Sequence, residues 1–204
     1  NLSIPQSLSS RCAVAVLGVD LAKRSVQLHG VDSSGAVVLR RAIAADAFVA
    51  WCQERLAPGT VVAMEACASA HHYGRALTAA GFTVRLIAPH RVTPYRLQGK
   101  AAKNDANDAA AVCEAASRPH MLFVDVKSTE QQALLLAHAF RQGYIEARTA
   151  LVNRVRGALL EFGVALPQGI EQLRAALPLL LEPTAVLAQR LPGTLRTLLE
   201  QSLD

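Results

Sequence analysis

The sequence predicts an α/β domain built on a mixed five-stranded sheet with flanking helices, followed by an all-helical, coiled-coil-like region. Near the start of the chain, three short apolar runs are joined by tight connections, which is typical of antiparallel strands. Strand and helix patterns then alternate, which is typical of parallel crossover units. From about residue 127 the apolar residues follow helical spacing. At 204 residues, the chain can hold one such domain and a helical appendage.

The elements of the α/β domain follow from apolar runs and their breakers. The Ser-rich residues 1–11 are expected to form a flexible arm. A turn is expected at residues 32–35, which read Asp-Ser-Ser-Gly. Asp46 and Ser69 are expected to cap helices. The expected strands are residues 12–19, 25–31, 36–43, 60–64 and 83–88, and the expected helices are residues 46–56 and 69–80.

The rest of the chain is expected to be mostly helical. Ser128 and Gln131 have the spacing of a capping box, and from there to residue 162 only Gly143 and Gly157 interrupt the helical pattern. We therefore divide the chain into an arm (1–11), an α/β domain (12–126) and a helical region (127–204). The other expected segments are a basic loop at 90–102, a helix at 105–117, an extended piece at 121–126 and helices at 171–181 and 185–203, with Pro178 as a breaker.

Composition narrows the class of protein. Hydrophobic residues make up 51% of the chain and charged residues 18%, which is globular composition. The net charge of +5 favours a polyanionic partner. Aromatic residues make up 4%, which argues against a single-strand binder that relies on base stacking. No apolar run has the length of a membrane span, no signal peptide is recognisable, and the absence of an initial Met suggests a trimmed start.

Four cysteines are scattered singly along the chain, without a CxxC pair. This spacing fits neither a zinc site nor a disulfide framework. We expect them to be reduced thiols, most of them in the core, as in a cytoplasmic protein.

Four acidic residues are placed where a metal centre can form. Asp105 and Asp108 are three positions apart at the start of a predicted helix, so they lie on one helical face. Asp20 follows the first predicted strand and Glu65 ends the fourth. If those strands are parallel neighbours, all four carboxylates meet at one edge of the sheet and supply the oxygen ligands that two Mg²⁺ ions require. The alternative for Asp105 and Asp108 is the ordinary preference of acids for helix N-termini.

Six stretches of the chain carry a resemblance to a known family: GVDLAK (18–23), MEACASAHH (64–72), VRLIAP (84–89), KNDANDA (103–109), KSTEQQ (127–132) and RTALVNRVRG (148–157). The order of elements and acids resembles the ribonuclease H-like fold with a RuvC-type acid set. More narrowly, these stretches resemble the DEDD transposases of bacterial insertion sequences that use a bridge RNA. One departure is Ala68, where the family pattern leads us to expect glycine.

The resemblance implies a DNA transposase or recombinase that cuts and rejoins DNA under the guidance of a bridge RNA. It implies that Asp20, Glu65, Asp105 and Asp108 are the catalytic metal ligands of two Mg²⁺ ions, with Mn²⁺ as a substitute. The nucleophilic serine of the family belongs to a C-terminal domain that we expect to lie beyond this chain, so Ser69 is interpreted as a helix cap. Expected partners are DNA, guide RNA and further copies of the chain, as a dimer or tetramer without membrane association. The expected location is the bacterial cytoplasm, at the nucleoid during the reaction.

Basic residues near these features are candidate nucleic-acid contacts. Arginines recur along the long predicted helix beside an apolar stripe that includes Leu135 and Phe140. The alternative for every such side chain is an ordinary solvated charge, and for His71 and His72 a surface and a packing role. The candidate contacts are Lys23, Lys100, Lys103, Arg148, Arg154 and Arg156.

Three other functions remain open from the sequence. A stand-alone RuvC-like nuclease or junction resolvase would cut with a metal-bound water and need no serine. A sugar-kinase or actin-like ATPase shares the Gly-x-Asp pattern of Gly18 and Asp20 but needs a second glycine-rich lobe, which is not recognisable here. An RNA-binding assembly module would carry inert acids. The sequence does not define the target site, the guide RNA or the oligomeric state.

Overall fold

The computed structural model describes residues 13–96, 105–182 and 191–201, with the backbone alone at residues 105 and 106. The expected arm at 1–11 lies outside the described residues. The chain divides into two compact units, which we name the first unit (Asn1–Gln131) and the second unit (Gln132–Asp204). Each is described by itself.

The first unit is built on one six-stranded mixed sheet, which confirms the predicted α/β class. Its strand order is β3-β2-β1-β4-β5-β6. β1, β2 and β3 form an antiparallel meander, β4 and β5 run parallel to β1, and β6 is antiparallel to β5. The sixth strand arises from the piece that was expected to be extended at 121–126. The strands are β1 (Val16–Leu21), β2 (Ser25–Val31), β3 (Val37–Ala44), β4 (Val61–Glu65), β5 (Thr83–Ile87) and β6 (Phe123–Val124).

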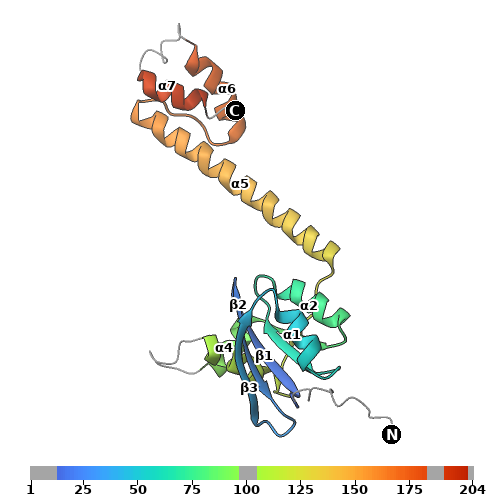
Figure 1. Cartoon of the computed structure of the whole chain (residues 1–204). Helices are drawn as coiled ribbons and strands as arrows, with labels where there is room; N and C mark the ends of the chain where they lie inside the picture. Colours follow the sequence, from blue (N-terminus) through green and yellow to red (C-terminus); the bar gives the residue numbers. More distant parts are fainter. Residues whose placement is uncertain (1–12, 97–104, 183–190, 202–204) are drawn as a thin grey trace, which may run out of the picture. The chain divides into compact units, whose positions relative to one another are not determined.

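Helices cover both faces of this sheet (Figure 1). α1 (Phe48–Arg55) and α2 (Ala70–Ala79) pack on one face, where Phe48 and Leu77 join the apolar side chains of the strands. α4 (Asp105–Ala116) packs on the other face. The segment that was expected to be a loop from residue 90 contains α3 (Pro89–Val92) and the 3-10 helix η1 (Thr93–Tyr95). Proline at the first helical position and again inside η1 favours these short turns.

The caps that the sequence predicted for α1 and α2 are wrong. The residue before α1 is Ala47, and no side chain caps that helix. Ser69 stands immediately before α2 but has a left-handed backbone (φ 68°), and its hydroxyl donates to the carbonyl of Ala68 instead of accepting from the helix. Because a capping side chain needs an extended backbone at this position, the left-handed turn removes the cap.

The second unit consists of helices, and the chain enters it through α5 (Thr129–Glu161). The capping box at the start of α5 is confirmed, because the Gln131 amide donates to Ser128 Oγ (3.1 Å) and the Ser128 amide donates to Gln131 Oε1 (2.9 Å). α6 (Ile170–Leu181) contains Pro178, which was expected to break it. α7 (Gly193–Glu200) follows.

The apolar stripe of α5 divides into two parts. Val155 and Leu159 are buried in the core of the second unit with α6 and α7 side chains such as Leu173 and Leu199. Leu160, near the C-terminal end of the helix, is exposed. Apolar side chains in the N-terminal part are exposed as well; these are Leu134, Leu135, Leu136, Phe140 and Tyr144. We name these five residues the exposed stripe.

Across the described ranges, no helix is long and apolar enough to cross a membrane. The prediction of core thiols holds for Cys52 and Cys113, whose pKa values burial raises to about 12 and about 11. It is wrong for Cys67, which is exposed because it lies in the connection between β4 and α2. Cys12 lies outside the described residues.

His29 predicts how the stability of the first unit depends on pH. It is 7% exposed on β2 and lies opposite Arg40 on β3. Burial, together with the Arg40 charge, lowers its pKa below the ordinary value of 6.5. The unfolded chain therefore binds a proton more readily than the folded chain, so the free energy of unfolding falls as the pH drops below 6.5.

Chemical denaturation at about pH 7.5 and about pH 5 measures this loss. It is expected to be smaller in His29→Gln than in the wild type. His71, whose pKa is also lowered, is unchanged in this variant and does not affect the comparison. An identical loss in both proteins would contradict the assignment to His29.

Candidate metal centre

Asp20 and Glu65 lie next to each other at one edge of the sheet. β1 and β4 are parallel neighbours, as the sequence predicted, and their register pairs Val19 with Met64. The following residue on each strand is an acid, so the two carboxylates lie side by side on the same face. Asp20 is still part of β1, one residue before its end, and Glu65 is the last residue of β4.

Gly18 allows α4 to lie directly against this edge. A Cβ atom at Gly18 would lie 2.5 Å from both the Cβ and the amide nitrogen of Cys113, and closer still to the carbonyl oxygen of Ala109. No side chain fits in that space, so hydrogen at this position lets the helix backbone touch β1. Gly18 and Asp20 are two residues apart and therefore share a face of the sheet, which places α4 beside the acids.

The first turn of α4 carries the remaining two acids. Asp105 begins the helix, and Asp108 follows three residues later and immediately precedes Ala109. This spacing puts both on one helical face. The side chain of Asp105 lies outside the described residues, as do Lys100 and Lys103.

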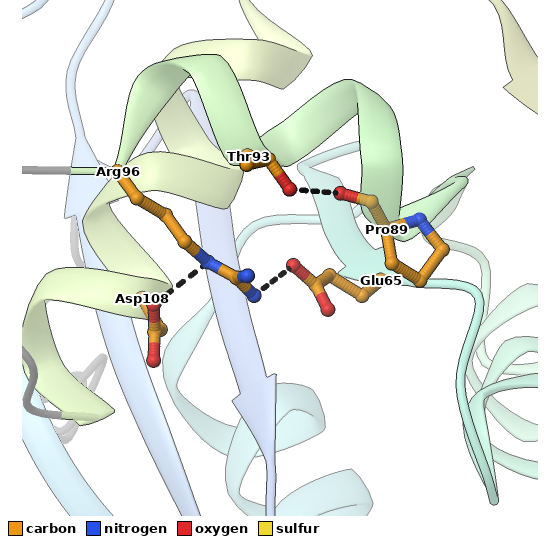
Figure 2. Close-up of polar contacts among 5 residues, drawn as sticks. All are labelled: Glu65, Pro89, Thr93, Arg96 and Asp108. Atoms are coloured by element: carbon orange, nitrogen blue, oxygen red, sulfur yellow. Dashed lines mark hydrogen bonds and ion pairs between the residues drawn. The ribbon is translucent and has the colours of Figure 1, made fainter.

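Arg96 lies between two of these carboxylates (Figure 2). Its Nη2 donates to Glu65 Oε1 at 2.6 Å, and its Nε lies 2.9 Å from Asp108 Oδ1. One guanidinium therefore spans the end of β4 and the first turn of α4. The sequence indicated a basic loop here but not this contact, because nothing in the spacing of Arg96 relates it to Glu65.

Burial and the neighbouring charges together set the pKa of Glu65. Burial is the largest influence and raises its pKa, while Arg96 opposes the rise and the charges of Asp20 and Asp108 add to it. Three carboxylates from three separate segments are thus within electrostatic reach of one another. Within the described residues, no three acidic, histidine or cysteine side chains stand together as a ready metal-binding group.

The basic side chains predicted to contact nucleic acid differ in exposure and in hydrogen bonding. Lys23 is exposed just after β1, and Arg148 and Arg154 are exposed on α5. Arg156 instead donates from Nε and Nη2 to the carbonyl of Leu166 at 3.3 and 3.0 Å, so it fixes the turn after α5. For Arg156, the described contacts favour a structural role over a nucleic-acid contact.

The two adjacent histidines after β4 also differ. His71 accepts a hydrogen bond from the Lys127 amide (3.2 Å), which ties α2 to the segment before α5. His72 is exposed, with its ring edge-on to Tyr73. This arrangement matches the packing and surface alternatives considered for them.

Sequence reasoning missed a basic groove between α3, η1 and the end of α4. Its volume is about 510 Å³. The Arg118 guanidinium lies over the Tyr95 ring, 5.8 Å from its centroid. The basic residues between 90 and 96 could be seen in the sequence. Their contact with the residues that follow α4 exists only in the folded chain. The groove is lined by His90, Arg91, Pro94, Tyr95, Arg118, Pro119, His120 and Met121.

Comparison with known proteins finds transposases in every case reported below. A family profile described as a transposase of the DEDD, IS110 type matches residues 17–163. A probable family 20 transposase of Pseudomonas aeruginosa is 48% identical over 194 residues, which cover 92% of this chain and 54% of that protein. The transposase for insertion sequence element IS1111A of Coxiella burnetii is 39% identical over 192 residues, covering 94% of this chain and 51% of the relative.

The putative transposase y4pF/y4sB of Sinorhizobium fredii is 40% identical over 161 residues, which cover 79% of this chain and 40% of that protein. The chain spans about half the length of the curated relatives that it matches. The profile match extends from β1 to the end of α5 and includes Asp20, Glu65, Asp105 and Asp108. This chain belongs to the DEDD transposases of the IS110 type.

Proposed function

We propose that this chain supplies the acidic, metal-binding part of a transposase site that cuts and rejoins DNA. The observation that carries the proposal is the position of Asp20, Glu65 and Asp108 at one sheet edge, where Gly18 admits α4. Asp105, one helical turn before Asp108, is the fourth ligand in this proposal. The family match favours a transposase over a stand-alone nuclease or resolvase.

The residues present fit a divalent metal. Carboxylate oxygens are the ligands that Mg²⁺ and Mn²⁺ prefer, and the like charges around Glu65 favour a bound cation. We infer that Asp20, Glu65, Asp105 and Asp108 hold the metal, as two Mg²⁺ ions. Bound there, the metal would polarise the scissile phosphate and stabilise the leaving oxygen. The carboxylates themselves hold the metal at the sheet edge.

Nucleic acid and further copies of the chain are the proposed partners. Lys23 and the basic groove, both in the first unit, offer cations to a phosphate backbone. Arg148 and Arg154 offer the same on α5. The exposed stripe supports self-association through the helical region, because exposed apolar side chains in a row are typical of protein contacts. Guidance by a bridge RNA, and a nucleophilic serine in a C-terminal domain, rest on the family resemblance.

Calorimetric titration with Mn²⁺ tests the metal centre. The chain is expected to bind Mn²⁺, and Asp20→Asn and Asp105→Asn are each expected to weaken binding by at least about ten-fold, because each removes a charged ligand. Asp125→Asn is the matched control, since Asp125 is an exposed acid of the same unit just beyond β6. Its affinity should equal that of the wild type.

If all four proteins bind Mn²⁺ equally, the metal is held elsewhere and the proposed site is wrong. If none binds, the carboxylate cluster is structural in the free chain. Titration in the presence of DNA and guide RNA then decides between a site that nucleic acid completes and the alternative of an RNA-binding module with inert acids. RNA affinity that survives both aspartate substitutions, without any metal binding, would favour that module.

A further inference from the structure

Arg96 occupies the space between Glu65 and Asp108 that a metal ion would need. Its contact distances of 2.6 and 2.9 Å mean that the two carboxylates are no further apart than one guanidinium can span. A guanidinium is a cation with donors in a fixed fork. In the protein without metal, this side chain therefore partly neutralises the acids.

The ion pairs of Arg96 with Glu65 and Asp108 can be replaced by a metal ion without loss of core packing. The Arg96 side chain is 38% exposed, compared with 15% for Glu65. Its Nε lies 2.9 Å from Asp108 Oδ1 but does not have the alignment of a hydrogen bond, so this contact is mainly one of charge. The side chain can leave towards solvent without disturbing the core.

Hydrogen bonds hold the backbone that leads to Arg96. The Arg96 amide donates to the carbonyl of Thr93 at 3.2 Å. The Thr93 hydroxyl donates to the carbonyl of Pro89 at 3.1 Å (Figure 2). These bonds brace α3 and η1. Rotation about the side-chain bonds of Arg96 is therefore enough to clear the site.

We propose that Arg96 is the internal counter-ion of this site and competes with the divalent cation for Glu65 and Asp108. A guanidinium and a divalent cation repel each other at such distances, so the metal binds fully only when Arg96 has turned away. Arg96 is thus a positioning residue that opposes metal loading in the free chain. This inference rests on the proposed function.

Titrating Arg96→Gln with Mn²⁺ beside the wild type tests the competition. The variant should bind Mn²⁺ at least about ten-fold more tightly, because the opposing charge is gone. Arg96→Lys should lie between the two, since a lysine keeps the charge but lacks the fork that spans both carboxylates. It also keeps the test usable if Arg96→Gln does not fold. Arg55→Gln is the matched control, because Arg55 is an exposed arginine in the last turn of α1 and has no part in the site or in the basic groove.

Thermal unfolding separates this role from a purely structural one. Without metal, Arg96→Gln should melt below the wild type, because the carboxylates lose their counter-ion. With saturating Mn²⁺ the difference should shrink or reverse. A structural role would instead lower the melting temperature equally in both conditions.

The Mn²⁺ titration distinguishes a failure of the Arg96 competition from a failure of the metal site. Equal or weaker Mn²⁺ binding by Arg96→Gln would overturn the competition and leave the proposed metal site intact. Absence of binding in the wild type and in both Arg96 variants would overturn the competition and, in the free chain, the metal site as well. Tighter binding by Arg55→Gln would show a general charge effect and would also overturn the specific role of Arg96.

Discussion

Replacing Gly18 by alanine is expected to disrupt the first unit and abolish metal binding. The new Cβ would lie 2.5 Å from the Cys113 Cβ and amide nitrogen and closer to the Ala109 carbonyl oxygen. Much of what it meets is helix backbone, which cannot rotate away as a side chain can. Overpacking of this kind typically costs about 1–3 kcal/mol and occasionally more, and we expect the upper end. Chemical denaturation measures the loss, and Mn²⁺ calorimetry measures the displacement of α4 from the acids.

Gly143→Ala is the matched control for this substitution. Gly143 lies within α5, and no atom lies within 4 Å of the position its Cβ would take. The same change there should raise stability by about 0.5–1 kcal/mol, because alanine favours a helix more than glycine does. A Gly18→Ala protein that is as stable as the wild type and binds Mn²⁺ normally would contradict the close-packing account of the site.

Glu65→Gln is expected to reduce DNA strand cleavage by roughly 10³-fold, because one charged ligand of the metal and part of the charge complementarity to the reacting phosphate are lost. The substitution keeps the size of the side chain and its ability to accept a hydrogen bond from Arg96, so the fold should survive. The measurement is metal-dependent DNA strand cleavage, with the wild type and the variant compared side by side.

Glu114→Gln controls for the loss of a negative charge. Glu114 lies on α4, is about half exposed and pairs with Arg118 away from the acids. Cleavage by this variant should equal that of the wild type. Comparable cleavage by Glu65→Gln and the wild type would exclude Glu65 from the catalytic site, whatever its effect on metal affinity.

Much of the first unit could be predicted from the sequence because its signals are local. Apolar runs bounded by turn residues located the strands to within a few residues, and Ser128 with Gln131 located the start of α5. The proximity of Asp20 and Glu65 followed from one further assumption, that β1 and β4 are parallel neighbours. The acids of the candidate site were found in this way, and their role as ligands stays a prediction.

The features that the sequence did not predict depend on contacts between distant segments. Arg96 looked like any residue of a basic loop, because its pairing with Glu65 and Asp108 exists only after α4 has packed on the sheet. Ser69 has the residue type of a cap, yet its backbone is left-handed. The stripe on α5 has one helical period throughout, and only the position of α6 and α7 decides which part is buried, as at Leu159.

The pairing of β1 with β4 also has a consequence for how the site comes into existence during folding. It joins Val16 to Val61, and α4 then adds Asp108 from further along the chain. Contacts between residues distant in sequence form late and slowly, because closing a long loop costs entropy before the contact contributes any stability. No fragment of the chain that ends before α4 contains the complete set of acids. If the proposed site holds a metal, a nascent or partly unfolded chain is therefore expected to lack this ability until the first unit has finished folding.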